Sequence, residues 1–590
     1  MPRSPLLPIL PLVLVSALGL AACGGSGSSS EQSGKIATGQ LGNTGGGTDA
    51  TAKGPVTISG AKTGGIVTVL TNTGLTTTID PAEVYYLDTM SIDGELLTRS
   101  LTQYKYDPSS KQMVLVPDLA TDLGQHNDNY TKWTFTIRDG VKFEDGSPVT
   151  AKNVAWGIQR CMDAATFPTG PCQYYSNVYF RGGSKYQGPY TAPNQKFNAV
   201  KVNGNQLTIF MDKPFPDMPY WGAFPANGPV PLGQASDPKT YKNHPLSTGP
   251  YMIKSFSQAK EMVLEKNPYW DASTDPARTQ YPAGYDFKTQ QPSEKIDQIL
   301  MADSGSGKTT LTYDNLLAPD YLKMKQKSAD RLILGGQPCT FYWGPDNRKI
   351  TDKRIREALS WAYPYKNAIL AGGDIPGVTA IPATNLMPPG IPGRTAYNAT
   401  GRDPFQTDPA KAKQLLQQAN AVGYEIKFLF RADDPVSVKV KDAIVRALGQ
   451  AGFKATPVPT TIANYTADRA KTTSDINVRS ASWCSDWPSG STWLPTVYAN
   501  SDADKTGSLG ANYSVFSSNA VAKQINQIQL MPLDQQPKAW NDLDKEVMTK
   551  YFPLFPTYYG GVVMAHGSQI QGMNDDSALG MPTWNTMWVG

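Results

Sequence analysis

The segment most similar to a chemical motif is residues 304–310, which read Ser-Gly-Ser-Gly-Lys-Thr-Thr and follow a predicted strand. A phosphate-binding loop ends in this way, but it also needs a glycine five positions before Gly307, where this chain has Ala302. The residues after Lys308 are β-branched and aromatic, so no helix N-terminus is expected to point at a phosphate. The segment is therefore predicted not to bind nucleotides.

Catalytic and metal-binding patterns are missing from the rest of the sequence. It contains no Gly-X-Ser-X-Gly elbow and no His-Glu-X-X-His helix. The three histidines, His126, His244 and His566, are far apart, so a histidine-based triad is possible but unsupported. We predict that the chain is not an enzyme and that it holds no metal ion and no cofactor.

Four of the five cysteines lie in the main part of the chain, at Cys161, Cys172, Cys339 and Cys484. An even number in an oxidising compartment favours two disulfides, with three possible connectivities. Residues 162–171 form a turn-rich piece that can bring its two flanking cysteines together, which favours the pairs 161 with 172 and 339 with 484. Four buried free thiols are the alternative.

The composition of the 590-residue chain is that of a large globular protein, with 40% hydrophobic and 18% charged residues. Its 54 Lys+Arg and 50 Asp+Glu give a net charge of +4 without a basic stripe, which argues against nucleic acid as a partner. Twelve Trp and 29 Tyr are typical of clefts, where flat rings offer contact area at little entropic cost.

The N-terminus has the order of an export signal over residues 1–22, with Arg3, an apolar run and two alanines immediately before Cys23. Leu-Ala-Ala-Cys resembles the bacterial lipobox, which implies that the Cys23 thiol carries lipid, including palmitate, and becomes the new N-terminus. The alternative is a secreted protein with an odd cysteine. Residues 23–64 are rich in Gly, Ser and Thr and predict a flexible tether. No later stretch is apolar enough to cross a membrane, which predicts an extracytoplasmic, membrane-anchored protein.

The remaining chain alternates between strand and helix patterns. Asp408 and Pro409 supply an N-cap and a first helical position, and Gly423 follows the end of that helix. Strand, helix and strand in succession predict a βαβ unit and an α/β or mixed α+β fold. The predicted strands cover residues 65–71, 133–138, 426–430 and 453–458, and the predicted helices cover residues 410–419 and 438–448.

Several motifs, taken together and in order, resemble the extracellular solute-binding proteins of family 5, the oligopeptide-, dipeptide- and nickel-binding components of ABC importers. The longest motif reads WTFTIRDGVKFEDGSPVTA over residues 133–151. The similarity covers nearly all of residues 65–590. The other segments that carry it are residues 116–124, 247–251, 263–270, 350–359 and 551–556.

This resemblance implies a two-lobed periplasmic-binding-protein-like fold with a hinge made by two chain crossings. Lobe I is expected to take residues 65–338, including an extra subdomain over about 97–212, and to receive the returning residues 553–590. Lobe II is expected to take residues 339–552. The two lobes would close on a solute and bury it from water.

Within the family, the resemblance is closest to the oligopeptide binders. Residues 338–343 and 483–486 match the two places where those proteins carry a linked cysteine pair. The same match places Asp486 where the family anchors the α-amino group of a bound peptide, and a strand over about 83–87 is expected to pair with the peptide backbone. The implied ligand-binding residues are Tyr85, Tyr86, Ser482, Trp483, Cys484 and Asp486.

Simpler structural roles are alternatives for these residues. Asp486 precedes a Trp-Pro-Ser-Gly sequence and could be only a turn or cap residue. Tyr85, Tyr86 and Trp483 could be aromatic core residues. Some relatives carry a basic residue where this chain has Ser480, whereas Arg479 is one position earlier on the opposite face of a strand, which argues against its contacting a ligand carboxylate.

Two classes of function follow. The first is a monomeric peptide-binding lipoprotein that delivers an oligopeptide to an ABC permease and ATPase complex, with a dipeptide, sugar or metal chelate as alternative cargo. The second is an exported hydrolase that acts on peptides or cell-wall fragments. Backbone pairing gives affinity without sequence identity, so the sequence does not specify the preferred side chains of a peptide.

Overall fold

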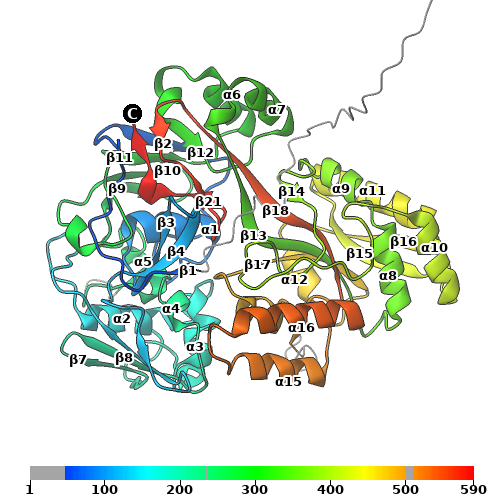
Figure 1. The fold of residues 1–590 in the computed structure, drawn as a ribbon, viewed down its shortest axis with the longest axis horizontal. Coiled ribbons are helices and arrows are strands. Elements are labelled where there is room, and N and C mark those ends of the chain that lie inside the picture. Colours follow the sequence, from blue (N-terminus) through cyan, green and yellow to red (C-terminus); the bar gives the residue numbers. More distant parts are fainter. Residues whose placement is uncertain (1–46, 234–236, 500–508) are drawn as a thin grey trace, which may run out of the picture. The chain divides into compact units, whose positions relative to one another are not determined.

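The structure is a computed structural model that describes residues 47–233, 237–499 and 509–590. The chain has the predicted mixture of helices and strands (Figure 1). The predicted signal peptide and Cys23 lie outside the described residues. None of the described helices combines the length and the apolar character that a membrane crossing requires.

The described part of the predicted tether, residues 47–64, makes specific contacts. Strand β1 (Gly47–Thr48) pairs in parallel with β4 (Gln112–Pro117). The Ile58 N–H donates a hydrogen bond of 2.9 Å to the Tyr281 hydroxyl. This part of the chain is therefore not free tether, because a Gly/Ser/Thr-rich composition does not prevent backbone pairing with a neighbouring strand.

A nine-stranded mixed sheet forms the centre of the molecule, in the order β17-β13-β18-β12-β2-β11-β10-β9, with β14 also on β18. Strand β2 pairs in parallel with β11 and β12, and the other pairs are antiparallel. Its strands are β2 (Ile66–Leu70), β9 (Tyr251–Ser257), β10 (Glu261–Lys266), β11 (Gly284–Lys288), β12 (Thr310–Thr312), β13 (Leu332–Pro345), β14 (Ala380–Ile381), β17 (Val478–Cys484) and β18 (Phe555–His566).

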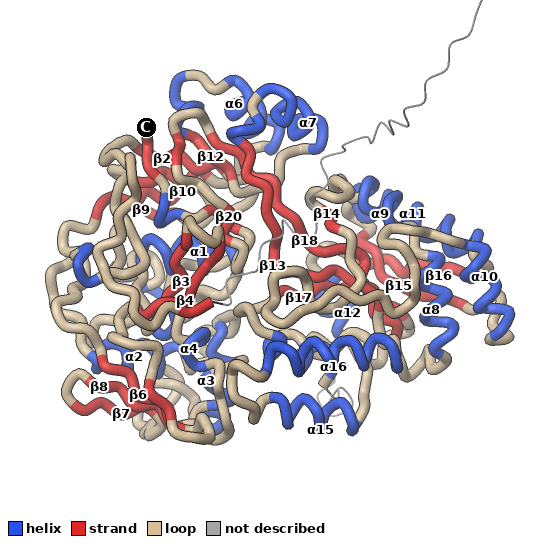
Figure 2. The backbone as a smooth tube through the Cα atoms, viewed as in Figure 1, coloured by secondary structure: helices blue, strands red, loops and turns tan. Residues whose placement is uncertain are grey.

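The two longest strands, β13 and β18, have 14 and 12 residues and run side by side (Figure 2). Their pairing is irregular between Gly336 and Thr340. A Cβ atom at Gly561 would lie 1.9 Å from the Val378 carbonyl oxygen, so only glycine fits there. We call residues 346–554, between these strands, the insert, and residues 47–331 and 567–590 the flanking part.

The insert has its own core, which includes Trp493 and Trp540 and extends to Trp343 of strand β13. It confirms the predicted βαβ unit, because β15 and β16 pair in parallel and α11 connects them. Asp408 caps α10 by accepting a hydrogen bond from the Lys411 N–H at 2.9 Å. The elements are α8 (Lys353–Ala362), α9 (Tyr365–Ala371), α10 (Pro409–Gln418), β15 (Glu425–Arg431), α11 (Pro435–Gln450), β16 (Lys454–Thr460), α12 (Tyr465–Ala470), α13 (Leu494–Tyr498), α15 (Asn519–Ile528) and α16 (Gln536–Lys550).

The flanking part has two larger cores, one around the four-stranded sheet β5-β6-β8-β7 and one against the nine-stranded sheet. The first contains the alternating strand that the sequence predicts at residues 133–138. The elements of the flanking part that lie outside the nine-stranded sheet and have not yet been given are α1 (Leu87–Ile92), β3 (Thr102–Asp107), β5 (Gln125–His126), β6 (Lys132–Thr136), α2 (Ala151–Cys161), α3 (Ser176–Tyr179), β7 (Val200–Asn203), β8 (Gln206–Phe210), α4 (Met218–Trp221), α5 (Pro238–Tyr241), α6 (Ser293–Ala302), α7 (Ala318–Lys327), β19 (Ile570–Gln571), β20 (Asp575–Asp576), β21 (Met581–Pro582) and β22 (Trp588–Val589).

Both predicted disulfides are present. Cys161 at the end of α2 pairs with Cys172, and Cys339 in β13 pairs with Cys484 at the end of β17. Cys339 and Cys484 are direct cross-strand partners with Cα atoms 3.9 Å apart.

The segment that resembled a phosphate-binding loop has a different local structure. Gly305–Thr309 form a short 3-10 helix, and strand β12 begins at Thr310. Strand β12 lies between β2 and β18. As predicted, no helix follows this turn, so its backbone N–H groups are not arranged to hold a phosphate.

Candidate functional site

The side chain of Asp486 lies where the insert meets the flanking part. Asp486 follows β17 by two residues, and the Ser485 N–H donates to the Pro338 carbonyl at 2.9 Å, which holds this segment against β13. The Asp486 carboxylate accepts a hydrogen bond from the Tyr175 hydroxyl of the flanking part. Tyr175 is close to Cys172, so each partner of this contact lies within three residues of a disulfide.

The Tyr85 hydroxyl interacts with the same carboxylate. Asp486 is partly accessible, but its carboxyl is desolvated, and burial raises its pKa to about 6 against the lowering effect of the two hydroxyls. No described basic side chain forms an ion pair with Asp486. The site therefore has a carboxylate with tyrosine donors and no cation.

A buried ion pair fixes the segment that carries Tyr85. The two terminal guanidinium nitrogens of Arg160, Nη1 and Nη2, donate to the Asp80 carboxylate. Its Nε atom donates to the Tyr190 hydroxyl at 2.8 Å. Arg160 belongs to α2, so this pair ties residues 80–86 to the helix that also carries Cys161.

Tyr86 lies beside Tyr85, with ring centroids 6.1 Å apart, and is 48% exposed. The expected strand over residues 83–87 is not present: residues 81–83 form a turn and α1 begins at Leu87. A β-strand is recognised by its hydrogen bonds to a partner strand. The partner expected at this position was the backbone of a bound peptide.

Trp487 connects the insert to the core of the flanking part. Its ring is buried 4.7 Å from Tyr175 and 6.1 Å from Phe224, measured between ring centroids. Four residues later, the Ser491 hydroxyl donates to the Asp217 carboxylate at 2.5 Å. Burial raises the pKa of Asp217 to about 6.

The other residues predicted from the resemblance have different surroundings. Trp483 packs on the core of the insert and donates from Nε1 to the Thr492 carbonyl at 2.8 Å. Cys484 is in the disulfide, and Ser482 lines a separate cavity of about 360 Å³ that the insert forms together with strands β13 and β18. Arg479 is 1% exposed and donates to Asp346 at 3.1 Å, which agrees with the argument against a ligand contact.

A small cavity of about 20 Å³ extends from Asp486 into the flanking part. We call it the acidic cavity, because its polar lining includes three carboxyl groups and no Lys, Arg or His side chain. Burial raises the pKa of Glu95 and of Asp576, and the charge of Asp576 raises that of Glu95 further. The polar side chains that line it are Ser91, Glu95, Gln103, Tyr104, Asp486 and Asp576.

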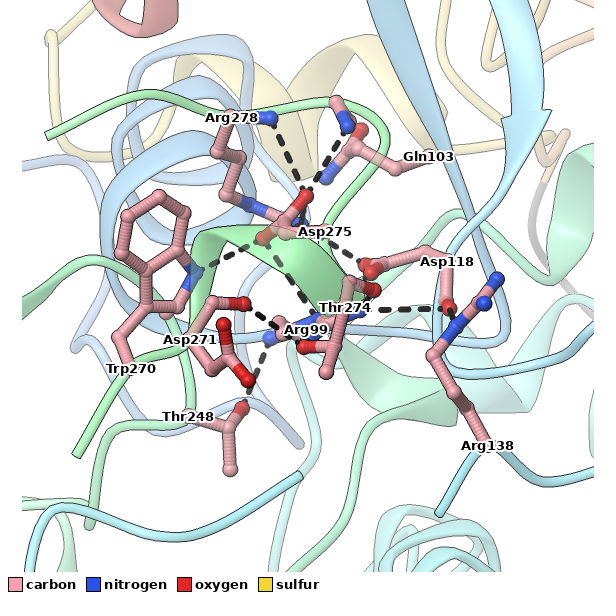
Figure 3. A network of polar contacts seen from close by, with 12 residues as sticks. Arg99, Gln103, Asp118, Arg138, Thr248, Trp270, Asp271, Thr274, Asp275 and Arg278 are labelled. Carbon is pink, nitrogen blue, oxygen red and sulfur yellow. Dashed lines mark hydrogen bonds and ion pairs between the residues drawn. The ribbon is translucent and has the colours of Figure 1, made fainter. Parts of the chain in front are cut away.

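The backbone beside Glu95 is held by a buried polar network (Figure 3). Glu95 lies in a five-residue π-helical turn, Asp93–Leu97. The Gly94 carbonyl in this turn accepts hydrogen bonds from Gln103 at 2.6 Å and from Arg278 at 2.7 and 2.9 Å. Arg278 is in turn paired with two aspartates of the network, so its charge is already balanced. π-Helical turns are frequent at functional sites.

Sequence reasoning missed Tyr175, Trp487, Glu95 and Asp576. Their positions in the chain are far apart, so no spacing could bring them together. The Asp575-Asp576 doublet and the Trp that follows Asp486 were the only visible signals.

Comparison with known proteins places the chain in context. Residues 114–505 match the model of a protein family described as "Bacterial extracellular solute-binding proteins, family 5 Middle". The probable D,D-dipeptide-binding periplasmic protein DdpA of Escherichia coli is 22% identical, over 78% of this chain and 82% of that protein. The periplasmic murein peptide-binding protein MppA of Escherichia coli is 23% identical, over 81% and 85%.

Solved structures with the same fold include the clavulanic acid biosynthesis oligopeptide binding protein 2, with a TM-score of 0.79, 22% identity, and coverage of 93% of this chain and 99% of that chain. The unliganded open form of MppA has a TM-score of 0.68, 20% identity, and coverage of 91% and 99%. These structures show that the fold is the two-lobed one that the sequence predicted.

Proposed function

This chain belongs to the bacterial extracellular solute-binding proteins of family 5, and we propose that it is the substrate-binding lipoprotein of an ABC importer that captures oligopeptides and delivers them to a membrane permease. Members of the family are substrate-binding proteins and not enzymes. The oligopeptide cargo, the lipid anchor and the permease are the parts that we propose.

The observation that carries the proposal is the Asp486 carboxylate, which is desolvated beside two tyrosine hydroxyls and has no cation among the described residues. A carboxylate in such surroundings needs a proton or a positive partner. The ammonium group of a peptide N-terminus supplies that charge and can form a charge-assisted hydrogen bond. Tyr85 and Tyr86 would lie along the bound backbone.

We propose that closure occurs about β13 and β18. Lobe I would contain residues 65–338 and 553–590, with the subdomain at about 97–212, and lobe II residues 339–552. The division of the cores supports this, because one core contains buried residues only from Tyr342 to Phe555. A ligand closes such a protein only if it binds the closed form better than the open form.

The proposed location is the outer face of the cell membrane, with lipid on Cys23. The Leu-Ala-Ala-Cys sequence supports it. Acyl chains supply about 0.8 kcal/mol per buried CH₂, so Cys23→Ser should move the protein from the membrane fraction to the soluble fraction. A variant that stays on membranes after a salt wash would contradict the anchor.

The test of the function is binding from a mixed pool of peptides of two to six residues. We expect native mass spectrometry to show intact peptides bound to the full chain. N-terminal acetylation of such a peptide should lower its affinity by about 30-fold or more. Peptide fragments in place of intact peptides would indicate a hydrolase. Binding of sugars or metal chelates without peptides would refute the proposed cargo.

A further inference from the structure

Glu95 has the features of a ligand-binding residue. It is 3% exposed and lines the acidic cavity, and its Oε2 atom accepts a hydrogen bond from the Asn585 N–H at 3.0 Å. Its Oε1 atom has no hydrogen-bond partner among the described residues. A buried carboxyl oxygen without a partner is costly, so such a group calls for an explanation.

Other groups around the acidic cavity do not neutralise Glu95. Asp576 is 2% exposed and uses one oxygen to accept from the Ala578 N–H at 2.9 Å. The Tyr104 hydroxyl has no partner among the described residues. The charge of Arg278 acts on Glu95, but the guanidinium donates to the Gly94 carbonyl and pairs with two aspartates.

A metal ion does not suit this arrangement. No group of three acidic, histidine or cysteine side chains in the described parts of the chain converges closely enough to coordinate one. The acidic cavity of about 20 Å³ has room for a group the size of one water molecule, which is also the size of an ammonium group. Ammonium groups donate three hydrogen bonds and suit acceptors that are spread around a small space.

We propose that the acidic cavity binds a second ammonium group of the ligand, the side-chain amine of a lysine-like residue at the first or second position of a peptide. This inference rests on the proposed function, because it takes the peptide N-terminus to be at Asp486. Asp486 is partly accessible and also lines the acidic cavity, so a side chain near the N-terminal end of the peptide starts close to the cavity. The preferred cargo is therefore a peptide with a basic N-terminal end.

The binding test uses two pairs of synthetic peptides and the full chain. The pairs are Lys-Ala-Ala with norleucine-Ala-Ala, and Ala-Lys-Ala with Ala-norleucine-Ala, which differ in the side-chain amine. For at least one pair we expect the lysine peptide to bind about 10- to 100-fold more tightly, because it pairs a buried charge. Equal affinity within both pairs overturns the inference and leaves the proposed function intact. Failure of all four peptides to bind overturns both.

Glu95→Gln tests the residue itself. Burial raises the pKa of Glu95, so glutamine resembles its protonated form and the fold should be kept. We expect the preference for lysine over norleucine to fall to less than threefold, with little change for the norleucine peptide. Asp93→Asn is a matched control. Asp93 is a buried acid of the same turn that accepts a hydrogen bond from the Thr98 hydroxyl and does not line the acidic cavity. A preference that survives Glu95→Gln, or that Asp93→Asn also removes, overturns the assignment.

Proton release gives an independent readout. The groups that face the acidic cavity are Glu95, Asp486, Asp576 and Tyr104, with Arg278 behind Glu95. A bound ammonium favours the ionised carboxylates, so the lysine peptide should release more protons at pH 7 than the norleucine peptide. Calorimetry in buffers of different ionisation enthalpy measures this. Equal proton release for both peptides contradicts the proposal.

Discussion

Asp486 and Asp544 are two aspartates of the insert with nearly the same chemistry and different positions. Each accepts a hydrogen bond from a tyrosine hydroxyl, and burial raises the pKa of each to about 6. The partner of Asp544 is Tyr498, 46 residues away in the same core, whereas the partner of Asp486 is Tyr175, 311 residues away in the flanking part. A raised carboxyl pKa alone therefore does not mark a binding site.

The surroundings separate the two roles. Asp544 is fully buried and also accepts a hydrogen bond from the Met387 N–H at 3.4 Å, so its interactions lie within one packed core. Asp486 is partly accessible, lines a cavity and connects two separately packed parts of the chain. We infer that Asp544 stabilises the insert and that Asp486 binds ligand.

Removal of the Cys339–Cys484 disulfide should lower the free energy of unfolding more than any other change considered, and it removes a constraint two residues before Asp486. The chain-entropy relation gives about 5 kcal/mol for a bridge with a sequence separation of 145. The same relation gives about 3 kcal/mol for Cys161–Cys172, with a separation of 11. Denaturant unfolding of the two double Cys→Ser variants checks this order. Equal losses, or no loss, would contradict it.

Asp486→Asn should reduce peptide affinity by about 2–5 kcal/mol, or roughly 30- to 4,000-fold, because the variant leaves the peptide ammonium without its charge partner. Asp544→Asn is the matched control and should leave the affinity within about twofold of wild type. Isothermal titration with a free peptide and its acetylated form measures both. If Asp544→Asn weakened binding as much as Asp486→Asn, the distinction between the two aspartates would be wrong.

Asp544 should instead appear in the pH dependence of stability. Its pKa rises from 3.8 in the unfolded chain to about 6 in the fold, so the folded state binds the proton more tightly. This contribution is fully present below pH 3.8 and is lost as pH rises to about 6, a change of about 3 kcal/mol. Unfolding between pH 4 and 7 should therefore show a steeper decline in wild type than in Asp544→Asn. Parallel curves would contradict the shift.

Much of the fold could be predicted because its signals are local. The N-cap Asp408, the period-two strand at residues 133–138 and the βαβ order each depend on neighbouring residues, and the structure confirms them. The segment over residues 47–64 could not be predicted in this way. Its strand β1 exists only because a distant strand offers a free edge.

The site was predictable only where a motif carried it. The resemblance singled out Asp486, after Trp-Cys-Ser, and Tyr85 as ligand-binding residues, which stays a prediction, and the structure brings these two side chains together. Tyr175 and Glu95 lie in segments without any such motif, and only the folded chain brings them near Asp486. Trp483 is at a matching motif position and packs against the core of the insert, so its contact with a ligand also stays a prediction.

Tyr175→Phe is the finest test of the comparison, because it removes one hydroxyl and keeps the ring. A donor to a carboxylate favours the charged form, so its loss should raise the pKa of Asp486 above about 6. Hydrogen bonds to charged groups contribute about 1.5 kcal/mol, which corresponds to about one pKa unit, so the ionised fraction of Asp486 at pH 7, and with it the affinity, should fall about twofold. The ratio of wild-type to variant affinity should be larger at pH 6 than at pH 7 and should approach one as pH rises to 8, because the Asp486 carboxyl is then ionised in both proteins. Tyr498→Phe beside Asp544 is the control and should change stability without changing affinity or its pH profile. An unchanged pH profile in Tyr175→Phe would show that the Tyr175 hydroxyl does not tune Asp486 for the ligand.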